Sequence, residues 1–321
     1  MIMSASSLAS GSLVTVLGGS GFLGRYIVQK LAALGCRVRV GVRYPETAIF
    51  LKPLGNLGQI SIIRVDVGTG QGLFGAFEGA NAGVNLVGIL DERGGQRFDE
   101  VQMKGAAAAA QAAARAGVSA YLQMSAIGAD AGSSIAYART KGAGEAEVLA
   151  ALPFATILRP SLVVGPEDQF LNRFAAMARM APMLPVVSGA SRFQPVYVLD
   201  VAEAVVAALG ATAARGRTYE LGGPDVMSFR EIMMMINRET GLNRPLLALP
   251  DAMARLMGRV GDMLPFVPMT SDQFAMLQKD NVVSVEAPGL ADLGVAPTPM
   301  SAFVPKMMAR YRPGGRFGAT S

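Results

Sequence analysis

Three glycines near the start of the chain stand at three-residue spacing, at Gly18, Gly21 and Gly24. They follow the apolar run of residues 13–17 and precede a helix-like segment at residues 25–34. In such a position the first glycine permits a sharp turn, the second lets the backbone approach a pyrophosphate, and the third lets the helix lie close to the strand, with its N-terminus facing the phosphates. A flexible turn is the other interpretation, but the order of strand, loop and helix favours a dinucleotide-binding loop. The predicted cofactor contacts in this loop are Gly18, Gly19, Ser20, Gly21, Phe22, Leu23 and Gly24.

Two side chains further along the chain indicate acid and base chemistry. Tyr137 and Lys141 lie four residues apart on a predicted helix at residues 135–149, so both side chains are on one face. An ammonium group beside a phenol lowers the pKa of the phenol and can hold a nicotinamide ribose, which makes the tyrosine a usable proton donor or acceptor near neutral pH. Ser125 ends a predicted strand at residues 121–124 and supplies a hydroxyl group. We therefore take these three residues as candidate catalytic and cofactor-binding residues.

The end of the second predicted strand, at residues 37–42, bears on the choice of cofactor. An acidic residue usually stands there where NAD is preferred, because it accepts hydrogen bonds from the ribose hydroxyls. This chain has Arg43 at the position, with Arg39 shortly before it. A guanidinium group suits a phosphate rather than a hydroxyl group, so we predict NADPH in preference to NAD. The alternative is that Arg43 is only a solvated loop residue.

Further candidate contacts follow the next two strands. Asp66 comes directly after a predicted strand at residues 60–65, where a carboxylate can accept a hydrogen bond from the adenine amino group. The same aspartate is also a suitable N-cap for the following helix, and both interpretations stay open. An apolar run at residues 83–90 predicts a fourth buried strand whose end lies near the middle of a bound dinucleotide. By position, the other candidates here are Val67, Val87 and Gly88.

The order of these segments predicts an α/β fold. Strand-like and helix-like segments alternate up to residue 158, which is typical of a Rossmann-type doubly wound parallel sheet. Beyond Gly165 the chain is richer in Met and Pro, and its pieces leave and rejoin the main sheet. We therefore predict a dinucleotide-binding domain at 1–165, which 194–222 rejoins, and a smaller, discontinuous C-terminal lobe. That lobe comprises 166–193 and 223–321.

Composition excludes several classes of site. The chain of 321 residues has one cysteine and no histidine, which excludes an intramolecular disulfide, a multi-cysteine metal site and histidine-based catalysis. We predict no metal. The net charge is +5, but the basic residues are scattered among acids, so nucleic acid is not an expected partner. We also expect neither a signal peptide nor a transmembrane helix, because no apolar segment is long enough.

Two C-terminal features have more than one interpretation. An apolar stripe at helical spacing predicts either a helix packed on the core or an interfacial helix that lies on a membrane or a large partner. Its members are Met253, Leu256, Met257, Val260 and Leu264. Near the end of the chain stand basic residues without acidic neighbours, which suit anionic lipid, an acidic partner or a solvated terminus. They are Lys306, Arg310, Arg312 and Arg316.

Taken together, these residues resemble those of an extended short-chain dehydrogenase/reductase. The resemblance runs from the glycine loop through Asp66, Ser125, Tyr137 and Lys141, and it adds Pro160 to the cofactor contacts. Within that family the chain is similar to an atypical branch, the nucleotide-binding accessory subunits of respiratory complex I. The most specific match is residues 158–173, Leu-Arg-Pro-Ser-Leu-Val-Val-Gly-Pro-Glu-Asp-Gln-Phe-Leu-Asn-Arg. Further matches lie at 195–201, 219–224 and 280–282.

The resemblance implies a function. Members of this branch keep a dinucleotide, usually NADPH, as a bound structural cofactor in the peripheral arm near the membrane junction. It implies other complex I subunits as partners, peripheral contact with membrane lipid or the quinone entrance, and a place on the cytoplasmic, matrix-equivalent face of the inner membrane. Tyr137, Lys141 and Ser125 would then be vestigial as catalytic residues.

Two departures from the broader family weaken catalysis more than binding. Gln102 stands where an enzyme of that family often has Asn, and residues 85–87 replace a His-containing stretch. The intact Tyr and Lys pair keeps a second hypothesis open, a free NAD(P)-dependent oxidoreductase or epimerase. A regulatory sensor of the cofactor ratio is a third, and it predicts reversible binding.

Overall fold

The computed structural model describes residues 8–92, 94–263 and 269–315. The chain forms two compact units. The sheet unit comprises Met1–Pro160, Leu199–Leu221 and Ser284–Ala296, and the second unit comprises Ser161–Val198, Gly222–Val283 and Pro297–Ser321. The domain organisation inferred from the sequence stays a prediction, because compactness does not test which parts fold as separate domains.

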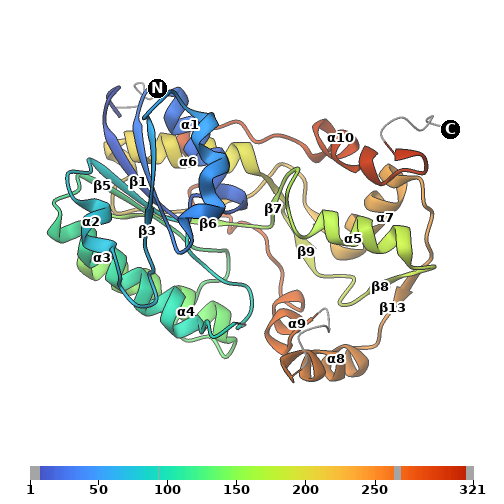
Figure 1. The fold of residues 1–321 in the computed structure, drawn as a ribbon. Coiled ribbons are helices and arrows are strands. Elements are labelled where there is room, and N and C mark those ends of the chain that lie inside the picture. Colours follow the sequence, from blue (N-terminus) through green and yellow to red (C-terminus); the bar gives the residue numbers. More distant parts are fainter. Residues whose placement is uncertain (1–7, 93, 264–268, 316–321) are drawn as a thin grey trace. The chain divides into compact units, whose positions relative to one another are not determined.

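The sheet unit contains seven parallel strands in the order β11-β6-β5-β4-β1-β2-β3 (Figure 1). This arrangement confirms the predicted Rossmann-type α/β fold. The strand order reverses between β1 and β4, and in doubly wound sheets ligands bind at the carboxyl ends of the strands at such a point. The strands are β1 (Leu13–Leu17), β2 (Arg37–Val42), β3 (Ile60–Arg64), β4 (Ala82–Asn85), β5 (Ala120–Met124), β6 (Thr156–Pro160) and β11 (Thr218–Leu221).

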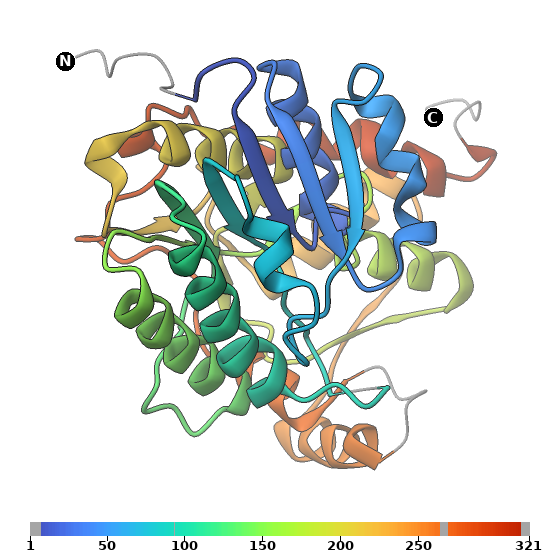
Figure 2. The same ribbon diagram turned by 60° about the vertical axis from the view of Figure 1, so that its left-hand side comes forward.

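Helices cover both faces of this sheet. On one face lie α2 (Leu73–Phe77), α3 (Gly105–Arg115) and α4 (Ala136–Ala151), and Figure 2 shows α3 and α4 side by side in teal and green. The alanines of α3 are buried against the sheet, so small side chains allow close packing on this face. The other face carries α1 (Phe22–Ala33) and α6 (Val198–Gly210). Shorter helical turns are η1 (Pro45–Leu54), the π-helix η2 (Asp99–Lys104), η3 (Thr212–Ala214) and η4 (Ala291–Leu293).

The second unit is built from helices and three two-stranded sheets. Its core packs Phe229, Ile232, Met233 and Ile236 of one helix against neighbouring helices. That helix begins at Phe229, where Ser228 forms a capping box with Glu231. The helices are α5 (Leu171–Met180), α7 (Phe229–Thr240), α8 (Asp251–Met263), α9 (Ser271–Leu277), α10 (Val304–Met308), η5 (Met300–Ala302) and η6 (Ala309–Tyr311). The strands are β7 (Val163–Val164), β8 (Leu184–Val186), β9 (Arg192–Phe193), β10 (Val196–Tyr197), β12 (Met227–Ser228) and β13 (Leu246–Ala248).

The family-specific stretch at residues 158–173 supports the backbone of the second unit where it enters α5. The Asp168 carboxylate accepts a hydrogen bond from the backbone N–H of Leu171 at 2.6 Å. The Asn172 amide donates to the carbonyl oxygen of Asp168, and its own oxygen accepts from the hydroxyl group of Tyr311. These polar residues therefore connect the start of α5 to the C-terminal helical turn.

Two expectations from the sequence are wrong. The fourth strand ends at Asn85 rather than continuing to residue 90, because the Asn85 side chain accepts from the backbone N–H of Val87 and turns the chain out of the sheet. The interpretation of the α8 stripe as a core face is also wrong for most of its described members. Met253, Leu256 and Val260 are exposed, whereas Met257 packs against a small apolar cluster together with the buried Ala254.

Other parts of the C-terminal predictions have specific outcomes. Leu264 and Arg316 lie outside the described residues. Arg310 and Arg312 donate to the backbone carbonyls of Pro166 and Glu239, so both guanidinium groups are used inside the second unit. Within the described ranges, no helix has both the length and the apolar character to cross a membrane.

Candidate functional site

The glycine loop connects β1 to α1 by a turn that a side chain would disturb. Gly18 has φ +76°, a conformation that favours glycine, and its N–H donates to the carbonyl oxygen of Gly41 on β2. The N–H of Gly21 donates in turn to the carbonyl oxygen of Gly18 at 3.1 Å. The turn is therefore fixed by backbone hydrogen bonds on both sides.

Gly24 allows α1 to lie directly on this turn. A Cβ atom at Gly24 would lie 2.5 Å from the carbonyl oxygen of Gly18 and 2.6 Å from the Cα of Gly19, which no side chain can tolerate. No side chain caps the start of α1 at Gly21 in the described structure, so its first N–H groups remain available to an anion. The loop is thus a cradle with the geometry of a pyrophosphate site.

The two arginines of β2 have different environments. The guanidinium group of Arg39 donates to the carbonyl oxygens of Gly75, Ala76 and Glu78, so it caps the end of α2. Arg43 is exposed, and its guanidinium carbon lies 5.8 Å from the ring centre of Tyr44. Of the two residues, Arg43 is the one available to a phosphate.

Asp66 and Val67 follow β3 and play different parts. The Asp66 carboxylate accepts from the backbone N–H of Gly68, and α2 begins only after Gly72, so the N-cap interpretation of Asp66 is wrong. One carboxylate oxygen of Asp66 therefore fixes the turn after β3, and the carboxylate does not cap α2. Val67 is buried in the core on the α3 side of the sheet.

The turn after β4 brings Val87 against the glycine loop. A Cβ at Gly18 would lie 3.3 Å from a methyl carbon of Val87, so this side chain forms one wall of the cradle. The turn is fixed by Asn85, whose amide nitrogen donates to the Gln123 side chain at 3.0 Å. This buried amide pair was not predicted, although two amide residues in otherwise apolar strands were the available signal.

Ser125 and Lys141 meet at the carboxyl ends of β4 and β5. The Lys141 Nζ donates to the carbonyl oxygen of Met124 at 3.3 Å, and a Cβ at Gly88 would lie 3.1 Å from that nitrogen. The Ser125 hydroxyl is buried and has no hydrogen-bond partner among the described residues. Because a buried hydroxyl without a partner is costly, its position suits a polar ligand.

Tyr137 lies one turn before Lys141 on α4, as predicted, and it contacts an aromatic neighbour. Its ring meets the ring of Phe98 edge to face, with 5.9 Å between the ring centres. Phe98 was not singled out from the sequence, and its only signal was that it is an isolated aromatic residue in a polar stretch. Gln102, on the π-helix η2, has both atoms of its amide group buried without a partner among the described residues.

The titration of this pair differs from the prediction. Burial raises the pKa of Tyr137 to about 12, and no lowering by Lys141 offsets it. Burial lowers the pKa of Lys141 to about 8, against the opposing effect of Glu145. The expectation that the lysine lowers the pKa of the tyrosine is therefore wrong for the protein without ligand, in which the phenol stays protonated at neutral pH.

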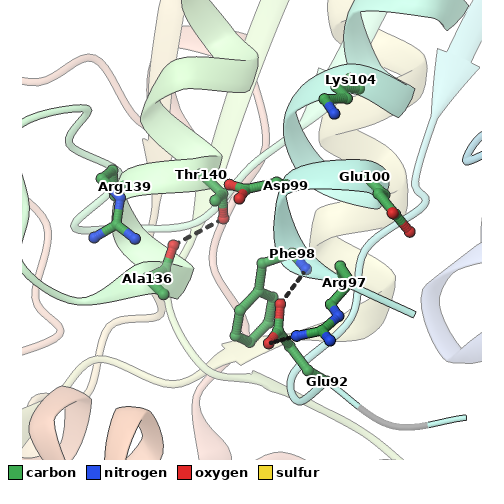
Figure 3. A pocket seen from close by; sticks show the side chains of 9 residues that line it. All are labelled: Glu92, Arg97, Phe98, Asp99, Glu100, Lys104, Ala136, Arg139 and Thr140. Carbon is green, nitrogen blue, oxygen red and sulfur yellow. Dashed lines mark hydrogen bonds and ion pairs between the residues drawn. The ribbon is translucent and has the colours of Figure 1, made fainter. Parts of the chain in front are cut away.

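A cavity of about 340 Å³ is lined by residues of η2, of the loop before it and of the start of α4 (Figure 3). Phe98 lines this cavity and also contacts Tyr137, and the Glu92 carboxylate accepts from the backbone N–H of Phe98. Acidic and basic side chains are equally numerous in it, so it favours no single charge. The lining residues are Glu92, Arg97, Phe98, Asp99, Glu100, Lys104, Ala136, Arg139 and Thr140.

The site residues therefore fall into two groups. The glycine loop, Val87, Gly88, Ser125 and Lys141 gather at the carboxyl edge of the central strands. Arg43 and Asp66 follow β2 and β3 on the side of the sheet where a dinucleotide places its adenosine half. Pro160 ends β6. The contacts of these residues with a cofactor stay a prediction.

No cluster of metal-ligating side chains occurs in the described part of the chain.

Comparison with known proteins gives the wider context. Residues 14–222 match the NAD dependent epimerase/dehydratase family, whose members bind NAD(P). The chain is 36% identical to the mitochondrial NADH dehydrogenase (ubiquinone) 1 alpha subcomplex subunit 9 of Arabidopsis thaliana, over 98% of this chain and 82% of that protein. It is also 36% identical to a ceramide reductase of Caulobacter vibrioides, over 61% of this chain and 60% of that protein.

Solved structures show the same fold. The UDP-glucose 4-epimerase of Thermotoga maritima aligns with a TM-score of 0.72 at 17% identity, over 93% of this chain and 98% of that one. At such an identity the likeness concerns the fold alone.

The close packing at Gly24 predicts that a methyl group at this position lowers the stability of the fold. Gly24→Ala should lower the free energy of unfolding by about 1–3 kcal/mol, because the new Cβ displaces the backbone at Gly18. Gly75→Ala is the matched control on α2, where a Cβ meets nothing within 4 Å and the better helix former should stabilise slightly. Urea denaturation of both variants is the measurement, and equal stability of the two would contradict the predicted close approach.

The pKa of Lys141 predicts a pH dependence. The group has a pKa of about 8 in the folded chain and its ordinary 10.5 in the unfolded chain, which therefore binds more protons between these values. The free energy of unfolding of the nucleotide-free protein should rise by about 1–2 kcal/mol from about pH 7.5 to about pH 9.5. Lys141→Met should abolish this rise, and Lys52→Met at an exposed position should keep it. An equally steep rise in the Lys141→Met variant would show that the ammonium group is not desolvated.

Proposed function

The chain belongs to the NAD dependent epimerase/dehydratase family, in the group of the NADH dehydrogenase alpha subcomplex subunit 9 proteins, and we propose that it is an accessory subunit of respiratory complex I that binds NADPH as a structural cofactor. One observation carries the proposal. The similarity to a complex I subunit extends over 98% of this chain and 82% of that relative, so it includes the second unit as well as the nucleotide-binding fold. A shared fold alone would not predict a common assembly.

The sheet unit offers a suitable place for a dinucleotide. The cradle at Gly18 and Gly24 has no room for side chains, and the start of α1 presents free N–H groups to a pyrophosphate. In the proposal, Lys141 holds the nicotinamide ribose and the partnerless Ser125 hydroxyl contacts the nicotinamide half. Asp66 would accept from the adenine amino group.

Tyr137 and Lys141 also suit a cofactor that is held without reaction. With its pKa raised to about 12, the Tyr137 phenol holds its proton firmly, and the Lys141 ammonium is already bound to the carbonyl oxygen of Met124. A ligand that binds only the folded chain stabilises it by mass action without reacting. The cofactor would supply contacts that hold the loop, the turn after β4 and the start of α4 together.

The proposed location follows from the proposed assembly. The chain would lie in the peripheral arm of complex I, at the cytoplasmic or matrix-equivalent face of the inner membrane, near the quinone entrance. Its partners would be other subunits of that arm together with membrane lipid. The relatives are named as complex I subunits, and the position within the complex is our inference.

A second candidate is an NADP(H)-dependent reductase. The similarity to a ceramide reductase, 36% over 61% of this chain, favours it, as does the presence of Tyr137, Lys141 and Ser125 together. In that role Ser125 would donate to a substrate carbonyl, and Tyr137 would pass its proton to the same oxygen. Lys141 would orient the ribose.

The two candidates predict different companions. A tagged chain in its native membranes, solubilised with mild detergent, should migrate with NADH:ubiquinone oxidoreductase activity, and denaturation of the purified material should release NADPH in about equimolar amount. A chain that migrates alone and oxidises NADPH in the presence of a ceramide-type ketone would contradict the accessory role and support the reductase. As a control, the untagged strain should yield neither the chain nor the activity.

The proposed preference for NADPH depends on Arg43. Arg43→Gln should weaken NADPH binding by about 10- to 100-fold, since it removes a charge-assisted hydrogen bond to the 2′-phosphate, and should leave NADH binding within about twofold. Arg37→Gln, at the opposite end of β2, is the matched control. Calorimetric titration of the nucleotide-free protein measures both affinities. A parallel loss for both nucleotides would place Arg43 outside the phosphate site.

A further inference from the structure

The outward face of α8 is apolar, which is the reverse of an ordinary surface helix. Met253 is 54% exposed, Leu256 is 62% exposed and Val260 is 38% exposed. These three side chains lie along one side of the helix over about 10 Å. The opposite side consists of Ala254, Gly258 and Gly261, all buried. Met257 packs against a small apolar cluster of the unit, whereas Met253, Leu256 and Val260 are directed away from it.

The charges of α8 are sorted in the same way. Asp251 accepts from the side chain of Gln278, and Asp262 accepts from the backbone N–H of Ser271, so the two aspartates fix the helix on α9 at its two ends. Figure 1 shows α8 lying beside α9. Arg255 and Arg259 are exposed, and neither has a carboxylate partner among the described residues. The acidic groups are used internally, whereas the basic groups remain available to an anionic surface.

The close packing on α9 holds this orientation. A Cβ at Gly258 would lie 3.0 Å from the Cα of Ser271, so only a small residue permits the contact. Ala254 and Phe274 share a small apolar cluster below the helix. A rotation that buried Leu256 would place a large side chain at this narrow contact, and the outward face is thus a fixed feature of the second unit.

We propose that the outward face of α8, formed by Met253, Leu256 and Val260 with Arg255 and Arg259 beside them, docks on the surface of a membrane that contains anionic lipid. Three partly exposed side chains cover far less than the roughly 1,000 Å² that a stable protein interface buries. An interfacial helix needs less, because shallow insertion of a few apolar side chains is supplemented by basic residues that reach lipid phosphates. The two arginines on one flank of the stripe supply that charge complementarity.

This inference rests on the proposed peripheral membrane location and names the segment and the lipid class that create it. Arg310 and Arg312 are used within the second unit, so the proposal assigns the lipid contact to Arg255 and Arg259 of α8 and not to these two C-terminal arginines. The polarizable methionine side chain adapts to an irregular lipid boundary. Phosphate groups of the lipid would accept from the guanidinium groups at the level of the headgroups.

Flotation of the purified full chain with vesicles tests the proposal. The parent should float with vesicles of phosphatidylcholine that contain about 30% phosphatidylglycerol, and at least about fivefold less with phosphatidylcholine alone. For the triple variant Met253→Gln, Leu256→Gln and Val260→Gln, the fraction that floats with the anionic vesicles should fall at least about tenfold. The pair Arg255→Gln and Arg259→Gln should lose the preference for the anionic vesicles.

A matched control is available on α7. Met234 is exposed to the same extent as Met253, at 54%, and Arg230 lies beside it on the exposed side of α7. The variant with Met234→Gln and Arg230→Gln should bind anionic vesicles within about twofold of the parent. Equal loss in this control, undiminished binding in the α8 variants, or a parent that does not float would each overturn the inference.

Other occupants of the face have distinct outcomes. Analytical ultracentrifugation that shows a dimer dissociated by the triple variant would assign the face to a second copy of the chain and overturn the lipid proposal. Loss of the triple variant from detergent-solubilised complex I, with its vesicle binding intact, would assign it to a protein subunit. A parent that floats with anionic vesicles but does not migrate with complex I would support the α8 inference and contradict the proposed function, and the converse result would do the opposite.

Discussion

The contact between α1 and the turn before it is the constraint on which the nucleotide-binding half depends. At Gly24 the helix backbone lies so close to Gly18 and Gly19 that a single Cβ atom would overlap both. This contact directs the uncapped N–H groups of α1 toward the carboxyl ends of the central strands. It also brings the turn against β2, where Gly41 accepts from Gly18, and against Val87 after β4. A backbone contact of this kind depends on the absence of side chains at three positions, which explains how a short glycine pattern can specify it.

The family-specific residues, by contrast, mainly hold the chain together. Arg159 on β6 forms a bidentate pair with Glu145 of α4 and lies 3.8 Å from Glu220 of β11. Glu220 accepts in turn from the backbone N–H of Ser284. One network therefore connects α4, β6 and β11 with the segment Ser284–Ala296, which belongs to the sheet unit. Removing one member of such a buried group leaves uncompensated charge and is strongly destabilising. Arg159, which lies in the 158–173 stretch, therefore helps to stabilise the fold of the sheet unit.

Much of the fold could be predicted because its signals are local. Apolar or alternating runs predicted the first three central strands at residues 13–17, 37–42 and 60–65, close to their observed bounds. The orientation of α8 could not be predicted, because an apolar stripe at helical spacing does not say which side meets the core. The side that meets α9 is defined by Ala254 and Gly258, whose small side chains give almost no periodic signal. Likewise the apolar run continues past β4 and does not indicate where the strand ends. The strand ends at Asn85 because its side chain accepts a hydrogen bond from the backbone N–H of Val87.

In the candidate site, too, the positions of residues could be predicted from the sequence, whereas their protonation could not. Spacing places Tyr137 and Lys141 on one face of α4, but protonation depends on burial and partners that spacing does not report. Here burial acts on both groups and disfavours their charged forms, raising the pKa of Tyr137 and lowering that of Lys141. The Lys141 ammonium group also donates a hydrogen bond to the backbone carbonyl oxygen of Met124. Spacing therefore identifies the two residues, whereas their protonation follows from the packing around them.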